Sequence, residues 1–255
     1  MRVRLGLAAV LLLALGRPAA AEWPYLTEES SLVGGGRYRL SAGISETRQE
    51  SRHLPGGEGT LWTFPEVEGT LGVGPHAEVS FQYELLWFDP EEGKTGAYDT
   101  GDLRLWTKLG LFPDALRGLA LRFGVKLPNA SADRGLGTNE TDVFLAALYG
   151  RRLGELRFDV NAGLAILGDP HRSQTQDDLV TWGVAIRGPV WGRLGAGAEA
   201  SGRSGPFGVG RRRDFATVAA VVGWHGTRWR LDAAGRRGFR DAEGWGWVAG
   251  VTYER

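Results

Sequence analysis

Residues 76 to 87 have the sequence HAEVSFQYELLW, in which an apolar side chain occupies every second position from Ala77 to Trp87. The positions between them begin with His76, Glu78, Ser80, Gln82 and Glu84. Successive side chains of a β-strand point to opposite faces, so this stretch predicts a strand with one apolar and one polar face. Ionisable groups at every second position do not fit a strand that is packed on both faces in a soluble core.

The same alternation recurs along residues 34 to 255 and is again clear in LALRFGVKL at residues 119 to 127. Lipid offers the backbone no hydrogen-bond partner, so a chain that spans a membrane with strands must close its sheet on itself. We therefore predict an all-β, membrane-spanning, antiparallel up-and-down β-barrel of twelve strands. The predicted strands cover residues 37–45, 60–73, 77–87, 102–111, 119–127, 141–149, 155–167, 179–188, 192–201, 214–224, 227–235 and 245–254.

The connections between these strands alternate in length. Odd-to-even connections are long and polar, whereas even-to-odd connections are short. Outer-membrane barrels alternate long external loops with short periplasmic turns in this way. Together with the even strand number, this predicts a bacterial outer-membrane location with both termini periplasmic. The short connections include Gly74-Pro75, Pro113-Asp114-Ala115, Arg152-Leu153-Gly154, Gly188-Pro189 and His225-Gly226.

The composition agrees with a sheet protein. The chain has 40 Gly, 10 Trp and no Cys. Gly inside a helix costs roughly 1 kcal/mol relative to Ala, which disfavours a helical bundle, whereas curved sheets use Gly at kinks. The lack of Cys excludes a disulfide framework, a thiolate metal site and Cys catalysis.

The first 21 residues have the features of a secretory signal peptide. Arg2 and Arg4 form a positive start, residues 5 to 16 form an apolar core, and Ala19-Ala20-Ala21 supplies small residues for cleavage. An N-terminal membrane anchor would need about 20 apolar residues. We predict a cleaved signal peptide at residues 1–21, a periplasmic lead-in at residues 22–33 and the barrel at residues 34–255.

The charge is balanced and dispersed. After removal of the signal peptide, 27 basic and 30 acidic residues remain, a net charge of −3. Nucleic-acid binding would need a basic stripe on one face, so no nucleic-acid partner is predicted. A soluble β-sandwich or lipocalin-like barrel is the alternative fold. A small soluble barrel turns its apolar side chains inward, however, whereas here charged residues oppose a face of Leu, Val and aromatics.

Several motifs between residues 60 and 170 resemble, in their order and spacing, those of the phenol-degradation meta-pathway (MetA-pathway) transporter family of bacterial outer-membrane β-barrels. The resemblance implies an outer-membrane barrel that transports small molecules. One departure is the C-terminus, Tyr253-Glu254-Arg255, where such barrels often end in an aromatic residue recognised by the barrel-assembly machinery. The motifs are Phe64-Pro65-Glu66-Val67-Glu68, Ala77-Glu78-Val79-Ser80-Phe81, Gly101-Asp102-Leu103, Lys108-Leu109-Gly110, Gly124-Val125-Lys126-Leu127-Pro128, Leu136-Gly137-Thr138 and Thr141-Asp142-Val143.

The candidate site is a ladder of charges on the lumen face of neighbouring strands. Pairing the predicted strands sets each member beside the next. Such a constriction would order the field that a permeating solute experiences. The alternative is that the charges satisfy one another and stiffen the wall, since exposed pairs contribute about 0 to 1 kcal/mol each. In order around the barrel, the ladder consists of Glu66, Glu84, Arg104, Lys126 and Asp142.

Four further residues are expected in the lumen. Lys108 and Arg122 would form a second, basic rung below the ladder. Trp62 and Trp106 would narrow the bore, which twelve strands already make small.

Catalysis and metal binding have little support. The four histidines fall in predicted loops or turns, and adjacent polar residues in a solvated loop are more often simply loop. We predict no enzyme activity, no metal and no cofactor. The combinations considered are His53 with Ser51, His171 with Asp169 and Ser173, and His171 with Asp169, Asp177 and Asp178, while His76 and His225 lie in turns.

The predicted function is an outer-membrane channel or transporter for passive uptake of small solutes, aromatic or hydrophobic ones among them. A structural or surface-interaction barrel without transport is the first alternative, and a surface lipid-modifying enzyme the second. The expected partners are outer-membrane lipid, lipopolysaccharide near Arg211-Arg212-Arg213, the assembly machinery and the solute. The sequence leaves the oligomeric state open.

Overall fold

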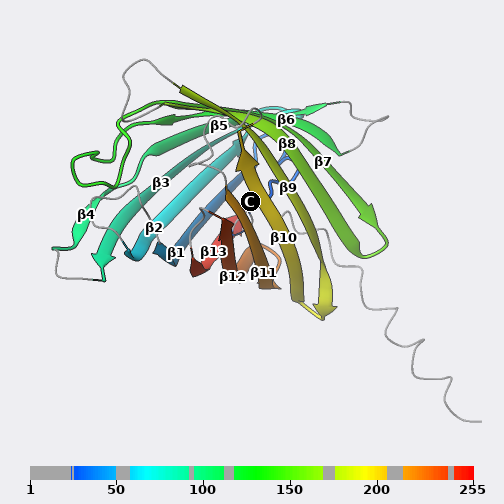
Figure 1. Ribbon diagram of the computed structural model, residues 1–255. Helices are drawn as coiled ribbons and strands as arrows, with labels where there is room; N and C mark the ends of the chain where they lie inside the picture. Colours follow the sequence, from blue (N-terminus) through cyan, green and yellow to red (C-terminus); the bar gives the residue numbers. More distant parts are fainter. Residues whose placement is uncertain are drawn as a thin grey trace, which may run out of the picture.

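The structure of this chain is a computed structural model, which describes residues 24, 26–49, 58–91, 95–111, 118–168, 176–205, 215–240 and 244–255. Within these ranges the chain forms antiparallel strands that lie side by side around a common lumen (Figure 1). None of the residues in these ranges belongs to a helix long and apolar enough to cross a bilayer.

The strands follow one another around the sheet in chain order. They are β1 (Tyr38–Gln49), β2 (Gly59–Gly72), β3 (Ala77–Pro90), β4 (Ala97–Thr100), β5 (Leu103–Leu111), β6 (Leu119–Leu127), β7 (Asp142–Leu153), β8 (Leu156–Gly168), β9 (Gln176–Trp191), β10 (Leu194–Ser204), β11 (Phe215–His225), β12 (Trp229–Arg240) and β13 (Trp245–Glu254). The short β4 and the following β5 both pair with β3 and together make one wall strand. The fold is therefore a closed antiparallel barrel of twelve wall strands, which confirms the predicted fold class.

The first and last strands close the barrel. β1 pairs with β13 from Arg39↔Glu254 to Thr47↔Gly246. Beyond that ladder, the Tyr38 N–H donates to the Arg255 carbonyl (2.9 Å) and the Arg255 N–H donates to the Tyr38 carbonyl (3.0 Å). Closure leaves neither strand as an exposed edge, which is the condition for a sheet in lipid.

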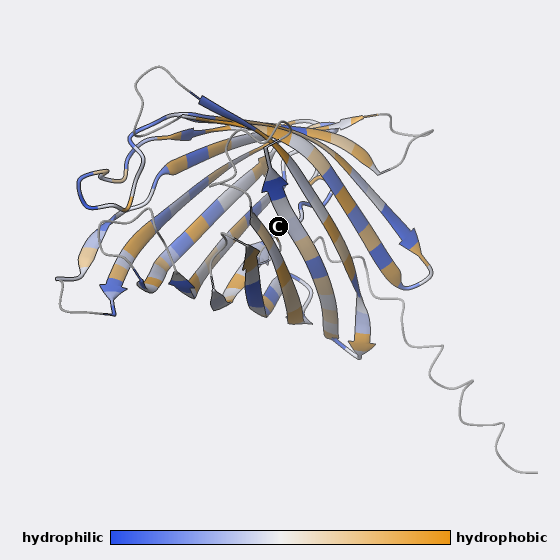
Figure 2. Ribbon diagram, in the orientation of Figure 1, coloured by the Kyte–Doolittle hydropathy of each residue, from blue (hydrophilic) through white to orange (hydrophobic). Residues whose placement is uncertain are grey.

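The two faces of the wall differ as the alternation predicts. Apolar side chains point outward, as at Val184 with 45% of its surface exposed and Leu164 with 53%. Polar and charged side chains such as Asp159 and Glu199 point inward and are buried. Figure 2 shows the resulting alternation of hydrophilic and hydrophobic bands along the strands. A continuous apolar outer surface of this size needs lipid rather than water around it.

The barrel has a loop end, where β2 begins and β3 ends, and a turn end, where β2 ends and β3 begins. One predicted turn is misplaced. β9 continues through Pro189 to Trp191, and the chain turns at Gly192, whose φ of 57° suits glycine. Pro189 is accommodated because it lies next to the register shift between Leu194 and Gly195, where a missing N–H does little harm.

β2 contains an irregularity that changes which residues face the lumen. The register with both neighbouring strands shifts between Thr63 and Glu66, so two residues of β2 lie opposite one residue of each partner. Thr63 and Glu66 both point inward despite their odd separation. Trp62 consequently lies on the outer face, opposite the exposed Trp87. The prediction of Trp62 in the lumen is wrong, because a β-bulge shifts the alternation by one residue.

Trp62 belongs instead to an outer aromatic cluster. Its ring centroid lies 6.1 Å from that of Trp247 in an edge-to-face arrangement. The Trp247 indole N–H donates to Glu46 Oε2 (2.9 Å). Aromatic rings with a polar handle are typical of the membrane–water interface.

A loop folds against the point where β4 gives way to β5. The N–H groups of Asn129 and Ala130 donate to Asp102 Oδ1 at 2.9 and 3.0 Å. The Asn129 side-chain amide donates to Thr100 Oγ1 (3.0 Å). This loop, residues 128–141, is thereby tied to the wall at the loop end of the barrel.

The depth of a residue in the membrane can be tested within β9. Val184 lies at mid-strand and Val190 near the turn end, and both point outward with 45% and 67% exposed surface. We expect Val184→Arg to lower the free energy of unfolding by about 2–4 kcal/mol and Val190→Arg by about 0–1 kcal/mol. Denaturant unfolding in phospholipid vesicles, followed by tryptophan fluorescence, measures both. Equal losses would mean that the two residues do not differ in depth.

Candidate functional site

The predicted ladder is divided into two clusters on the lumen face. In the first, Arg104 Nη1 lies 3.0 Å from Glu84 Oε1. Glu84 is the register partner of Glu66, whose carboxylate accepts a hydrogen bond from the Gln82 amide (2.8 Å). Strands β2, β3 and β5 supply these residues, and the cluster sits about halfway along the barrel.

The second cluster lies nearer the loop end. Lys126 Nζ is 2.9 Å from Asp142 Oδ2 and 3.1 Å from Asp102 Oδ2, and it donates to Thr138 Oγ1 (2.9 Å). Arg104 and Lys126 are register partners, as predicted. Since both are cations, they do not pair with each other: Arg104 pairs with Glu84 on β3, and Lys126 pairs with Asp142 on β7 and with Asp102, which precedes β5. The ladder is thus broken between Arg104 and Lys126.

The predicted basic rung lies deeper, toward the turn end. Lys108 and Arg122 are register partners on β5 and β6. The Arg122 guanidinium stacks over the Trp106 ring at 4.0 Å from its centroid, and Trp106 in turn lies 5.3 Å from Phe144. Trp106 therefore faces the lumen, unlike Trp62. Its ring is an apolar wall beside two cations.

The carboxylate that joins Lys108 and Arg122 comes from the segment before β1. Glu28 Oε1 is 2.8 Å from Lys108 Nζ, and Glu28 Oε2 is 2.7 Å from Arg122 Nη1. Lys108 also pairs with Glu78 Oε1 on β3 at 2.8 Å. Lys108 and Glu78 are buried, with 2% and 1% of their surface exposed.

Residues 26–33, named here the lumen segment, lie inside the barrel. The N–H groups of Leu26 and Thr27 donate to the two carboxylate oxygens of Glu199 (2.9 and 2.7 Å). At its other end, the Val33 N–H donates to Glu78 Oε2 (2.7 Å). The prediction of a periplasmic lead-in placed this segment outside the wall. It lies inside because lumen side chains satisfy its backbone groups, which lipid or an apolar core could not do.

Asn161 on β8 holds the middle of the lumen segment from both sides. Its Oδ1 accepts from the Glu28 N–H (2.6 Å), and its Nδ2 donates to the Glu28 carbonyl (2.9 Å). This two-point contact mimics the hydrogen bonds of a neighbouring strand. It fixes the position of Glu28 along the barrel axis.

Glu29 enters a second group of charges beside the first. Its carboxylate oxygens lie 2.8 Å from Arg157 Nη1 and 3.6 Å from Arg187 Nη1. Asp159 sits between the same two arginines, 2.9 Å from Arg157 Nη2 and 2.8 Å from Arg187 Nη2. Glu29 and Asp159 are each 1% exposed. Charges this well shielded stay stable only because each has an opposite partner.

Glycines on the lumen face make room for the segment. A Cβ built on Gly183 would lie 2.9 Å from Thr27 Oγ1, and one on Gly150 would lie 2.6 Å from Ser30 Oγ. A Cβ on Gly110 would lie 3.0 Å from a Leu32 methyl group. Contacts of 2.6 to 3.0 Å leave no space for a side chain. The wall is therefore shaped around residues 27–32.

The sequence analysis missed these contacts for an identifiable reason. Arg157, Asp159, Arg187 and Glu199 are polar positions of the alternation, but nothing local marks them as neighbours. The available signal was the pair Glu28-Glu29 in a segment of undefined structure, together with glycines at lumen-facing positions. Neither identifies a partner without the closed barrel.

Part of the lumen wall near the loop end is apolar. Leu167 and Leu179 form a buried cluster with Ala165, and Phe144 packs against it. Leu86 and Phe88 on β3 also point inward near this end, with 7% and 4% exposure. These side chains form the apolar band, which shares the loop-end part of the lumen with the Lys126 cluster: Leu86, Phe88, Phe144, Ala165, Leu167 and Leu179.

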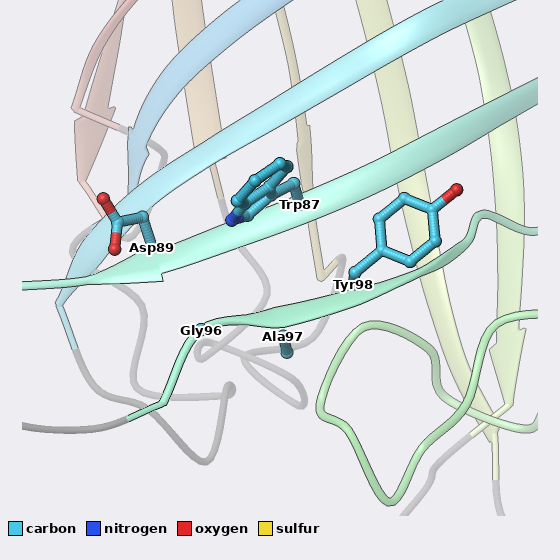
Figure 3. Close-up of a pocket in the computed structure, with 5 residues that line it drawn as sticks. All are labelled: Trp87, Asp89, Gly96, Ala97 and Tyr98. Atoms are coloured by element: carbon cyan, nitrogen blue, oxygen red, sulfur yellow. The ribbon is translucent and has the colours of Figure 1, made fainter.

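A separate recess of about 500 Å³ lies on the outer wall near the loop end. Trp87 and Tyr98, register partners on β3 and β4, border it together with Asp89, Gly96 and Ala97 (Figure 3). Trp87 and Tyr98 are 60% and 55% exposed. The recess faces away from the lumen and belongs to the aromatic rim of the outer surface.

The alternative sites of the sequence analysis receive no added support. His53, His171 and Arg211-Arg212-Arg213 lie outside the described residues. His225 is at the turn end, where its Nε2 lies 3.5 Å from Asp232 Oδ1. Within the part of the chain that the structure describes, no three His, Cys, Asp or Glu side chains are arranged to hold a metal ion.

The buried charges predict a large effect for one substitution. Asp159→Ala would leave Arg157 and Arg187 to share Glu29, so we expect the free energy of unfolding to fall by about 3–5 kcal/mol. Asp178→Ala, at an exposed position of β9, should change it by less than about 1 kcal/mol. Urea unfolding of both variants in vesicles measures the difference. A loss at Asp159 as small as at Asp178 would show that the arginines are solvated.

No protein-family model and no curated protein sequence matches this chain. Among solved structures, it is similar to an outer membrane channel from Pseudomonas putida F1, with a TM-score of 0.65 and 13% sequence identity over 89% of this chain and 98% of that one. It is also similar to the KdgM porin, with a TM-score of 0.51 and 10% identity over 84% of this chain and 98% of that one. At these identities the likeness concerns the fold, which is that of outer-membrane β-barrels.

Proposed function

We propose that this protein is a bacterial outer-membrane channel for passive movement of small hydrophobic solutes, aromatic ones among them, and that the lumen segment is the barrier to their passage. The observation that carries this proposal is the lumen segment itself. Residues 26–33 cross the interior and are held by side chains from β3, β5, β6, β8, β9 and β10. A barrel built only as a scaffold would have no need of such a removable obstruction.

The contacts of the lumen segment would allow it to move out of the lumen. Backbone groups of the lumen segment bond to side chains of the wall, those of Glu199, Asn161, Glu78 and Lys108 among them, instead of forming a ladder with a neighbouring strand. The segment can leave without breaking the hydrogen-bond ladder of the wall. Water entering the lumen would then solvate the released charges and lower the cost of their separation.

The apolar band supports hydrophobic solutes. Leu86, Phe88, Leu167 and Leu179 face the lumen near the loop end, where a porin for hydrophilic solutes would have polar side chains. Aromatic or aliphatic molecules gain about 25 cal/mol for each Å² of apolar surface removed from water. Such a surface would favour entry of an apolar solute over an ion. The similarity of fold to two outer-membrane channels and the sequence resemblance to the phenol-degradation family agree with this class.

The same proposal implies partners for the outer surface, the loop end and the last strand of the barrel. The outer face would contact lipid, and the loop end would meet lipopolysaccharide if both termini are periplasmic. The barrel-assembly machinery would handle the closing strand β13, in which Tyr253 packs against Trp229 at 4.7 Å between ring centroids. A barrel without transport stays the alternative, and conductance separates the two.

A reversible cross-link tests the barrier. A Cβ on Gly183 lies 3.4 Å from the Thr27 Cβ, close to disulfide geometry, and the chain has no other Cys. We expect Thr27→Cys/Gly183→Cys to be closed when oxidised and to recover ion conductance and solute flux on reduction. Planar bilayers and proteoliposome uptake of toluene measure both. Thr27→Cys alone, which cannot form the cross-link, is the control. Equal flux in the oxidised and reduced double variant would reject the barrier, and no flux in any state would reject the channel.

The apolar band predicts a selective effect. Leu179→Asn places an amide in the cluster with Ala165 and Leu167. We expect toluene uptake to fall about tenfold, the equivalent of roughly 1.4 kcal/mol, while chloride conductance changes little. Val190→Asn, on the outer face at the turn end, is the matched control and should leave both unchanged. A parallel fall in toluene and chloride passage would argue against a role for the band in selection.

A further inference from the structure

Four basic side chains from four strands converge where the lumen segment crosses the barrel. Lys108 is on β5, Arg122 on β6, Arg157 on β8 and Arg187 on β9. Lys108 and Arg187 are 2% and 8% exposed. These four residues are named here the basic cluster. Four cations this close together need anions around them to be stable in a largely dry interior.

Carboxylates of the wall and of the lumen segment both pair with the basic cluster. On the wall, Glu78 pairs with Lys108, and Asp159 pairs with both Arg157 and Arg187. Glu199 on β10 accepts two N–H groups of the lumen segment. Arg122 pairs with Glu28 of the lumen segment at 2.7 Å.

Glu28 and Glu29 fill the basic cluster as ligands would. Glu28 gives one oxygen to Lys108 Nζ and the other to Arg122 Nη1, at 2.8 and 2.7 Å. Glu29 gives its two oxygens to Arg157 and Arg187. Each of the two carboxylates therefore bridges two cations, one with each oxygen.

We infer that the basic cluster is a binding site for the carboxylate of a hydrophobic, aromatic-type solute, and that Glu28 and Glu29 are the chain's own occupants of that site. The inference rests on the proposed channel function, because a solute must reach the lumen to meet the cluster. Occupation by the segment and by the solute exclude each other. The solute carboxylate takes the place of Glu28 between Lys108 and Arg122.

The surroundings of Arg122 define the rest of the solute. The Trp106 ring covers one face of the guanidinium at 4.0 Å, and Phe144 continues the apolar surface at 5.3 Å from Trp106. A carboxylate bound at Arg122 would place an attached ring or chain against Trp106 and Phe144. Phe144 also packs against Ala165, Leu167 and Leu179 of the apolar band. The site therefore matches a monocarboxylate with an apolar body, in both charge and surface.

The binding test uses the full chain in detergent and two probes that differ only in charge, 4-phenylbutyrate and 4-phenylbutanamide. Glu28→Gln/Glu29→Gln removes the competing carboxylates and keeps the length of both side chains. By isothermal titration calorimetry, we expect this variant to bind phenylbutyrate at least about tenfold more tightly than the wild-type chain does, and at least about tenfold more tightly than it binds the amide. Glu58→Gln/Glu155→Gln, at exposed positions, is the control and should behave as wild type.

Adding Arg122→Gln to the double variant should abolish the preference for phenylbutyrate over the amide. If the double variant does not fold, Glu28→Gln alone is tested in the same way, since it removes the carboxylate between Lys108 and Arg122 and leaves Glu29 in place. Equal binding of acid and amide, or no gain over the wild-type chain, overturns the inference. Toluene flux that persists while carboxylate binding is absent rejects this inference and leaves the channel standing. Carboxylate binding without any flux rejects the channel alone.

Discussion

Every N–H and C=O group of a sheet in lipid must find its partner within the sheet, because the surrounding hydrocarbon supplies none. In this chain the requirement is met by the pairing of β1 with β13, which turns a row of neighbouring strands into a ring. Closure also determines the surroundings of the side chains that point into the barrel. Once the ring is complete, alternate side chains of all strands point into one confined space, where their charges have to be balanced against one another.

The interior meets that demand differently toward its two ends. Toward the turn end, carboxylates and basic side chains from strands far apart in the sequence neutralise one another, and residues 26–33 complete the balance. Toward the loop end, the apolar side chains of Leu86, Phe88, Leu167 and Leu179 share the lumen face with the ion pairs of Lys126. A solute that passes along this axis meets apolar and charged surfaces side by side at the loop end and a charged surface at the turn end.

The sequence predicted the strands and their faces correctly where apolar and polar residues alternate without interruption. Residues 77–87 and 119–127 lie in strands with the faces that the alternation predicts. The register pairs Arg104 with Lys126, and the Arg104 side chain reaches Glu84 on the lumen side. Trp62 was wrongly placed because a single extra residue in β2 moves every side chain before it to the opposite face. The local signal was Pro65, which lies in the bulge, because proline within a sheet is confined to edges, strand starts and bulges.

The position of the lumen segment inside the barrel could not be predicted from the sequence, for a different reason. Its position depends on contacts to six strands that come together only after closure, so residues 22–33 show no periodicity that could reveal it. Its two adjacent carboxylates have one more consequence. Glu28 and Glu29 carry negative charge, so a shift of the segment along the barrel axis would move charge across the membrane. A transmembrane voltage acts on each elementary charge with about 2.3 kcal/mol per 100 mV for a full crossing. A transmembrane voltage of one polarity would therefore hold the lumen segment in place, and a voltage of the opposite polarity would pull the segment out of the lumen.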